Sequence, residues 1–352
     1  MSQDRADSPA DISAAQGLLD LVTSSWKTQA AYVAAELRIP DLLADGPRTC
    51  DDLAAATRSH PPSLRRLLRA LTTLGLCRER DDGSFEITSA GLLLGTGVRG
   101  SLRSWTIWWG SQLWPVWGHL LYSVKTGQSA RKLLIGTEGF DHLQGDPTAA
   151  AVFNQALVEL TRLTCRSVVA AYDFSTLRRI VDVGGGYGEL LVAILSACPT
   201  VQGVLFDLPH TIAGGRRHLQ QAGLADRCQF VAGDFFESVP GGADAHVLKS
   251  VIHDWDDDCG IRILQNCRRA MTAAGRAAGR LLLIEQVLPD RLGTSPAHQS
   301  VVRSDLNMLV AQSGRQRTAA EFGDLLKRAG LGVTRIVPAG ATFSVIEAFV
   351  LE

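Results

Sequence analysis

The sequence predicts an α/β protein in which a mostly helical, winged-helix N-terminal domain precedes a doubly wound parallel sheet. Two observations support this class. From about residue 173 onward, short apolar strands alternate with helices, a pattern typical of a parallel sheet with helices on both faces. Before residue 98, short amphipathic helices lead into two short strands, the order found in a winged helix-turn-helix. We therefore predict a winged-helix domain at 1–98, a helical linker and pocket region at 99–172, and an α/β domain at 173–352.

The N-terminal domain is expected to consist of short helices and one hairpin. Apolar residues at helical spacing begin at Leu18, and Thr49 stands three residues before an acid, as in a capping box. The helix at 62–71 carries three arginines, and Asp82-Gly83 predicts the hairpin turn that follows. Those arginines permit two interpretations: contact with DNA phosphates, or the solvated face of a packing and dimerisation module. We favour the second because the whole chain has a net charge of −1.

Composition and charge exclude several classes of protein. The 35 Lys and Arg residues nearly balance the 36 Asp and Glu residues, so no overall field draws the chain to nucleic acid or an anionic membrane. Seven scattered cysteines without a C-x-x-C pair argue against a zinc site or a disulfide framework. The polar N-terminus has no signal-peptide pattern, and no apolar run is long enough to span a bilayer. We expect a cytoplasmic protein without a metal, a nucleic-acid partner or a membrane partner.

Tryptophans are concentrated in one short segment, since five of the seven lie between Trp105 and Trp117. Such a cluster indicates either a buried seam between helices or subunits, or an apolar wall for a flat ligand. The sequence leaves both interpretations open.

The α/β domain begins with a strand at 179–183, where apolar and β-branched residues follow one another. Glu321 stands three residues after Thr318, and this spacing predicts a second capping box at a helix start. The later predicted elements are, in chain order, a helix at 189–198, a strand at 203–206, a helix at 216–222, strands at 229–231 and 245–248, a helix at 261–271, a strand at 280–284, a helix from Thr318, and strands at 333–337 and 344–351.

A glycine-rich turn at 184–188 joins the first strand to its helix. Glycine lets the backbone approach a ligand closely at the carboxyl edge of such a sheet. A dinucleotide-binding fingerprint that started at Gly184 would require a glycine where Glu189 stands. The turn therefore does not match a pyrophosphate cradle.

Acids follow the next two strands. Asp207 ends the second strand and precedes Leu208, and a carboxylate at this place accepts hydrogen bonds from both hydroxyls of an adenosine ribose. Gly233, Asp234 and Phe235 follow the third strand, where an acid and a ring suit the amino group and the face of adenine. Together with the glycine-rich turn, these strand ends predict a nucleoside site that binds no phosphate.

Six segments of the α/β domain carry a family resemblance: VDVGGGYGELL, FDLPH, GDFF, HVLKSVIHDWDD, LLLIEQVLP and SGRQRTAAEF. In this order they resemble the motifs of the plant-type and bacterial small-molecule O-methyltransferases. The resemblance implies a Rossmann-like catalytic domain that uses S-adenosylmethionine (SAM), releases S-adenosylhomocysteine (SAH) and needs no metal. It extends to the winged-helix half, for which it implies an intertwined homodimer.

The resemblance also assigns binding residues. For SAM it implies Asp182, Gly184, Gly186, Asp207, Leu208, Gly233, Asp234, Phe235 and Lys249. For the acceptor it implies Trp105, Trp109, Phe153, Leu157, Asp254, Asn307 and Met308.

Three residues are assigned to catalysis by the same resemblance. His253 matches the general base, and Glu285 matches the acid that orients it. Gln316 stands where the plant enzymes carry a second acid, so it keeps a hydrogen-bond acceptor but no charge. A base is needed because a phenol, with a pKa of about 10, is mostly protonated at neutral pH and is a weak nucleophile.

The expected function is SAM-dependent methylation of a hydroxyl, in the first place a phenol, on a small aromatic or polyketide-type metabolite. One alternative is a relative that keeps SAM for a hydroxylation or an electrocyclic step, which the retained His253 disfavours. Another is a winged-helix regulator with a ligand-sensing domain, which the neutral charge disfavours. The sequence leaves open the acceptor, the position of methylation, and the choice among phenol, carboxylate and aliphatic alcohol.

Overall fold

The computed structural model describes residues 9–137, 140–273 and 279–352. The chain divides into two compact units, Met1–Gln112 and Leu113–Glu352. The finer boundaries expected at residues 98 and 172 stay predictions.

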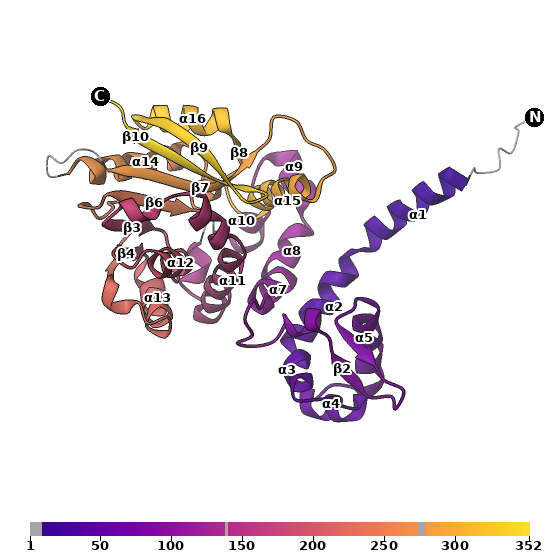
Figure 1. Ribbon diagram of the computed structural model, residues 1–352. Coiled ribbons are helices and arrows are strands. Elements are labelled where there is room, and N and C mark those ends of the chain that lie inside the picture. Colours follow the sequence, from indigo (N-terminus) through magenta and orange to yellow (C-terminus); the bar gives the residue numbers. More distant parts are fainter. Residues whose placement is uncertain (1–8, 138–139, 274–278) are drawn as a thin grey trace, which may run out of the picture. The chain divides into compact units, whose positions relative to one another are not determined.

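The N-terminal unit combines short helices with one small hairpin (Figure 1). Its elements are α1 (Pro9–Thr23), α2 (Ser25–Glu36), α3 (Ile39–Ala44), α4 (Cys50–Thr57), α5 (Pro61–Thr73), β1 (Cys77–Glu79), β2 (Phe85–Ile87), α6 (Ser89–Leu92) and α7 (Arg103–Trp108). The capping box at Thr49 is present, since its Oγ1 accepts the N–H of Asp52 at 3.2 Å. Strands β1 and β2 are antiparallel, and Gly83 in their turn has a φ of 76°, which favours glycine. Leu68 and Phe85 are fully buried in the core of this unit. The predicted order of helices and hairpin is confirmed.

The first helix of this unit carries exposed apolar side chains. Leu18, Leu19, Leu21 and Val22 of α1 are 54–69% exposed. An amphipathic helix gains most of its stability in proteins by burying such side chains against another element. Helix α1 therefore presents a surface suited to a further contact.

The C-terminal unit is an eight-stranded mixed sheet with helices on both faces. Its elements are α8 (Trp114–Trp117), α9 (Leu120–Thr126), α10 (Ala130–Ile135), α11 (Pro147–Ala171), β3 (Arg179–Val183), α12 (Glu189–Ala197), β4 (Gln202–Asp207), α13 (Pro209–Gln221), β5 (Cys228–Ala232), β6 (Ala245–Lys249), α14 (Asp257–Thr272), β7 (Arg280–Leu288), α15 (Pro296–Ala311), β8 (Arg317–Thr318), α16 (Ala319–Arg328), β9 (Leu331–Ala339) and β10 (Phe343–Val350).

The strand order is β5-β4-β3-β6-β7-β10-β9, and β8 pairs with β7 off this path. Strands β3 to β7 are parallel, as predicted, but β10 is antiparallel to both β7 and β9. The expectation of a wholly parallel sheet was therefore wrong at one strand, β10, which runs against its two neighbours. Only residues 340–342 connect β9 to β10, and a parallel crossover needs a dozen residues or more.

Neighbouring residues of β3 enter two different cores, one on each face of the sheet. Ile180 packs in the core that includes α11, α12 and α13, whereas Val181 packs in the core that includes α14 and α16 (Figure 1). Because β3 to β6 are parallel, the segments that follow them meet at one edge of the sheet. This edge carries the glycine-rich turn, Asp207, the segment at 233–235 and the loop of His253.

Within the described residues, no helix combines the length and the apolar character needed to cross a membrane. The same residues contain no group of three or more side chains arranged to hold a metal ion. All seven cysteines are free thiols.

Candidate active site

Glu285, in β7, has a fully buried carboxylate that contacts three donors from one loop. Its Oε1 accepts the backbone N–H of Val251 at 3.0 Å and that of Ile252 at 2.9 Å. Its Oε2 lies 2.6 Å from Nδ1 of His253. An ionised carboxylate only accepts hydrogen bonds, so Nδ1 carries a proton and Nε2 is left for other partners.

The loop of His253 begins with a residue in an unusual backbone conformation. Ser250 directly follows β6 with a φ of 56°, in the left-handed region that costs a non-glycine residue about 1–2 kcal/mol. Its N–H donates to the carbonyl of Ile284 at 3.0 Å. After this turn the next two N–H groups reach Glu285, and the 3₁₀ turn Ile252–Asp254 follows. Strain of this kind is often stored where a loop must present functional groups.

His253 lies between two carboxylates. Its Nε2 is 3.5 Å from Oδ1 of Asp254, while its Nδ1 contacts Glu285. Burial lowers the pKa of His253, but the two carboxylates outweigh burial and raise the pKa to about 9. Burial raises the pKa of Asp254 to about 6, against the opposing effect of His253. The two carboxylates therefore favour the protonated imidazole, and the charge of Lys249 opposes them.

Several predicted SAM-binding residues gather at the glycine-rich turn. Gly184 and Gly186 have φ values of 68° and 59°. Oδ2 of Asp207 accepts the N–H of Gly186 at 2.8 Å, and Oδ1 accepts the N–H of Leu208 at 2.7 Å. Burial raises the pKa of Asp207, and hydrogen bonds from these two N–H groups and from Thr211 oppose that rise. Asp207 and the turn were predicted to lie at the same edge of the sheet, and in the structure they are in direct contact.

A buried carboxylate lies beside the same turn. Asp182, in β3, is 2% exposed, and its Oδ2 accepts no hydrogen bond from any described residue. A Cβ at Gly185 would stand 2.6 Å from this oxygen, so a larger residue would force its neighbours apart. Burial and the nearby Asp207 raise the pKa of Asp182 to about 7, and Lys249 at the end of β6 opposes them. A buried acceptor of this kind calls for a partner, and it fits a ligand group that donates a hydrogen bond.

The segment that follows β5 is aromatic. Oδ1 of Asp234 accepts the N–H of Phe236 at 2.8 Å, and Phe235 lies 3.4 Å from where a Cβ at Gly184 would stand. The rings of Phe235 and Phe236 meet Trp255 edge to face, with centroid separations of 5.9 and 4.7 Å. Trp255 thus connects the predicted adenine-binding segment with the histidine loop. Neither Phe236 nor Trp255 was among the predicted site residues.

The predicted acceptor-binding residues belong to both units. Trp105 and Trp109 lie in the N-terminal unit, where their ring centroids are 5.4 Å apart. In the C-terminal unit, Oδ1 of Asn307 accepts the Nε1–H of Trp117 at 3.1 Å. Met308, the next residue of α15, is buried.

Helix α11 supplies the other two predicted acceptor residues. The ring of Phe153 lies 5.4 Å from that of Phe140, and Phe140 lies 6.2 Å from Trp255. Leu157, about one turn later on α11, is half-buried. Phe153 therefore joins the aromatic cluster that reaches the histidine loop.

Gln316 has other partners than His253. It is 2% exposed, its Nε2 donates to Oγ of Ser304 at 2.9 Å, and its backbone N–H donates to Oδ1 of Asp305 at 2.8 Å. Among the described residues, no hydrogen bond joins Gln316 to His253. The second acid beside this imidazole is instead Asp254, its neighbour in the chain.

Two buried arginines near this loop were missed by the sequence analysis. Arg131, on α10, is 4% exposed; burial lowers its pKa to about 10, and the charge of Asp254 opposes this shift. Arg317, in β8, is fully buried and donates to Asp257 and to the histidine loop. Arg317 stands inside the last of the quoted motifs, so the sequence offered a signal for it, but none for Arg131.

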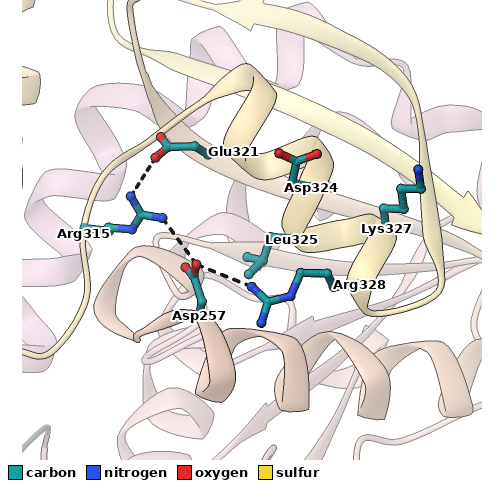
Figure 2. A pocket seen from close by; sticks show the side chains of 7 residues that line it. All are labelled: Asp257, Arg315, Glu321, Asp324, Leu325, Lys327 and Arg328. Atoms are coloured by element: carbon teal, nitrogen blue, oxygen red, sulfur yellow. Dashed lines mark hydrogen bonds and ion pairs between the residues drawn. The ribbon is translucent and has the colours of Figure 1, made fainter.

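A surface pocket is lined by none of the predicted site residues, as Figure 2 shows. Its lining comes from Asp257, Arg315, Glu321, Asp324, Leu325, Lys327 and Arg328. Arg315 pairs with Glu321 and with Asp257, and Arg328 also pairs with Asp257. Because these charged side chains already pair with one another, the carboxyl edge of the sheet is a better candidate for the active site than this pocket.

Known proteins resemble this chain over most of its length. Residues 117–332 match the family described as the O-methyltransferase domain, and residues 19–96 match the O-methyltransferase dimerisation domain. The phenazine O-methyltransferase PhzM of Lysobacter antibioticus is 41% identical over 331 residues, covering 94% of this chain and 95% of that protein. The 8-amino-8-demethylriboflavin N,N-dimethyltransferase of Streptomyces davaonensis is 39% identical over 320 residues, covering 90% of each.

A solved structure agrees with these matches. An O-methyltransferase from neocarzinostatin biosynthesis, crystallised with SAM and 2-hydroxy-5-methyl naphthoic acid, has a TM-score of 0.78 and 33% identity, covering 92% of this chain and 96% of that one. The expected fold class and family are confirmed. The chain belongs to the O-methyltransferase family in which a dimerisation domain precedes the methyltransferase domain.

Proposed function

We propose that the protein transfers the methyl group of SAM to a hydroxyl oxygen, in the first place a phenol, of a small aromatic or polyketide-type metabolite. The observation that carries this proposal is the contact of Nδ1 of His253 with Glu285, which leaves Nε2 to accept a proton. A hydroxyl needs such a base because it must lose its proton as the oxygen attacks. An amine attacks through its lone pair and has less need of a base.

The relatives support an aromatic acceptor. By name, one methylates a phenazine and another a riboflavin amine, and a third was crystallised with a naphthoic acid. One of these relatives methylates nitrogen, so membership of the family does not by itself show that this protein methylates oxygen. The proposal of an oxygen acceptor therefore rests on His253 as the base. None of these three relatives supports the non-methylating or regulatory alternatives.

The residues at the sheet edge fit SAM, which supplies a methyl group on a sulfonium sulfur and leaves as SAH. Asp207 suits the ribose hydroxyls, while Asp234 and Phe235 suit the adenine. The Oδ2 atom of Asp182 without a partner suits the ammonium of the methionine part, because a charged donor makes a strong hydrogen bond to a carboxylate. Lys249, which interacts with Asp182, complements the methionine carboxylate.

The proton on His253 constrains the mechanism. With its pKa raised to about 9, the ring carries two protons in the ligand-free protein and must lose one before it acts as a base. A cation bound at this sheet edge lowers that pKa by repulsion, and an acceptor hydroxyl that displaces Asp254 from Nε2 lowers it further. Nε2 then takes the hydroxyl proton as the oxygen attacks, and Glu285 stabilises the imidazolium. We expect the base to contribute about 10²- to 10⁴-fold in rate.

The full-length protein is tested with SAM and three matched ring compounds: a naphthol, the corresponding naphthylamine and naphthalene. We expect mass spectrometry to find one added methyl group on the naphthol, and His253→Ala to abolish most of this product. His60→Ala, which changes an exposed histidine of the N-terminal unit, is the control. Methylation of the amine alone, or full activity of His253→Ala, would overturn the proposal.

The proposal includes a homodimer formed through the N-terminal unit. The dimerisation match covers residues 19–96, and burial of the exposed leucines of α1 against a second copy would remove apolar surface from water. Light scattering should show a dimer for the parent and a monomer for the double variant Leu21→Glu, Val22→Glu. Leu292→Glu, at an exposed site of the C-terminal unit, is the control. A monomeric parent would contradict the homodimer.

A further inference from the structure

Arg317 contacts the backbone of the histidine loop from β8. Its Nη1 donates to the carbonyl of Ile252 at 3.0 Å, and its Nη2 donates to the carbonyl of Trp255 at 2.9 Å. These carbonyls stand before and after His253 in the chain. We propose that Arg317 is a positioning residue for His253, which holds the loop through its carbonyls; this inference rests on the proposed methyl transfer.

The peptide groups of Ile252 are held from two sides. Its N–H donates to Glu285 at 2.9 Å, and its carbonyl accepts from Arg317 at 3.0 Å. The backbone directly before His253 therefore cannot rotate without leaving a buried polar group unsatisfied. Glu285 contacts the start of the loop and the ring, whereas Arg317 also holds the carbonyl of Trp255, two residues after His253.

Both holding residues come from neighbouring strands. Strand β8 pairs with β7 in parallel, with Arg317 opposite Val287, two residues after Glu285. The residue directly before β8 is also held, since the N–H of Gln316 donates to Asp305 of α15. A site supported by regular elements holds its geometry more closely than one supported by loops alone.

Pairing with Asp257 does not by itself explain why Arg317 is placed beside the histidine loop. Oδ1 of Asp257 accepts from Nε and Nη2 of Arg317 at 3.1 and 2.8 Å, and Oδ2 lies 3.3 Å from Arg315 and 3.7 Å from Arg328. Figure 2 shows the latter two pairs at the surface pocket. These exposed arginines also pair with the acid, and in the described part of the chain neither side chain forms a hydrogen bond with the histidine loop. Among the described residues, only the buried, planar guanidinium of Arg317 contacts both the acid and the two carbonyls.

The substitution Arg317→Lys separates charge from geometry. A lysine keeps the positive charge near Asp257, but a single ammonium cannot reproduce the fork that spans the two carbonyls. The matched control is Arg328→Lys, which alters another partner of Asp257 and no contact of the loop. The parent and both variants are compared by NMR titration of ¹³C-labelled histidine, by kcat and KM, and by calorimetric binding of SAH. The His253 signal is assigned with His253→Gln.

In Arg317→Lys we expect the pKa of His253 to fall by about half a unit or more, because a looser loop carries the ring away from its two carboxylates. We expect kcat to fall about 10-fold or more with the affinity for SAH within about two-fold of the parent, since misplacement of a base affects the chemical step. Arg328→Lys should match the parent in all three measurements.

An unchanged titration and an unchanged kcat in Arg317→Lys would overturn the proposal, as would an equal loss of kcat and SAH affinity, which indicates a general structural role. If Arg317→Lys does not fold, the variant Asp257→Asn tests the proposal instead. It keeps the contacts of Arg317 with the two carbonyls, so the titration of His253 should stay unchanged. A shifted titration would show that the ion pair of Arg317 with Asp257, and not the carbonyl contacts, affects His253. The titration needs no turnover. A parent that methylates no hydroxyl would therefore reject the proposed function while the titration still tests the positioning role.

Discussion

Nδ1 of His253 lies 2.6 Å from Oε2 of Glu285, and the other oxygen of that carboxylate accepts the N–H of Ile252. One buried acid therefore sets both the tautomer of the ring and the backbone that carries it. Because Glu285 is fully buried, water cannot replace either hydrogen bond when the carboxylate is removed. Its substitution should affect chemistry and stability together.

Glu285→Gln is predicted to lower kcat by about 10²-fold or more, because it removes the charge that stabilises the imidazolium. The amide also turns a donor toward one of three buried N–H groups, so the free energy of unfolding should fall by about 1–3 kcal/mol. Rapid-quench kinetics and urea unfolding measure the two effects. The control is Glu237→Gln, which is 76% exposed. A variant with the parental kcat would show that Glu285 does not act on the base.

His253 should also make stability depend on pH. Its pKa in the folded protein is raised to about 9, above the value of about 6.5 in an unfolded chain. A group of this kind stabilises the fold fully below pH of about 6.5, and the contribution is lost as the pH rises through about 9. The shift corresponds to about 3–4 kcal/mol at most in the free energy of unfolding.

Urea unfolding of the ligand-free parent and of His253→Gln, at several pH values between about 6.5 and 9.5, measures this effect. The difference in the free energy of unfolding between parent and variant should shrink as the pH rises across this window. A difference that stays constant, or that grows with pH, would mean that the ring is neutral in the folded protein.

The carboxyl-edge residues were predictable because their position follows from local signals. Parallel strands end at one edge, so Asp207 and His253 can be placed together once the strands that precede them are recognised. The glycine-rich turn is similarly local, since Gly184 and Gly186 adopt left-handed conformations that few other residues tolerate.

Other features depend on partners far away in the chain. The insertion of β10 between β7 and β9 has no local signal, because the alternation of strands and helices along the sequence does not determine the order of the strands in the sheet. Arg317 donates to the carbonyl of Ile252, which lies 65 residues earlier in the chain, and only the folded structure shows this contact. For the same reason, the contact of Gln316 with Ser304 could not be inferred from the motif that contains Gln316.

Asp182→Asn is predicted to change stability and binding in opposite directions. The pKa of Asp182 is raised to about 7 from 3.8, so its charge destabilises the ligand-free fold increasingly as the pH rises between these values. Asparagine removes that charge, and the ligand-free variant should be more stable at pH of about 8 by about 1–4 kcal/mol. The affinity for SAH should fall about 10-fold or more, because the ammonium loses a charged acceptor.

Thermal melts of the ligand-free protein and calorimetric titration with SAH measure the two changes at Asp182. Asp290→Asn, at an exposed site, is the control and should alter neither. Tighter or unchanged binding of SAH by Asp182→Asn would remove this carboxylate from the proposed SAM site.

Gln316→Glu restores the acid that the plant enzymes carry, yet it is predicted not to raise kcat. Nε2 of Gln316 donates to Ser304, and its backbone N–H is bound to the carboxylate of Asp305. A glutamate cannot donate to Ser304, and it brings a second negative charge near Asp305 at a site that is 2% exposed. The free energy of unfolding should fall by about 1–3 kcal/mol at neutral pH and recover in acid as the new carboxylate is protonated. Gln299→Glu, at an exposed position of α15, is the control for kcat and urea unfolding. A 10-fold higher kcat in Gln316→Glu, well above any effect of the control, would mean that residue 316 does act on His253, as the motif alone had implied.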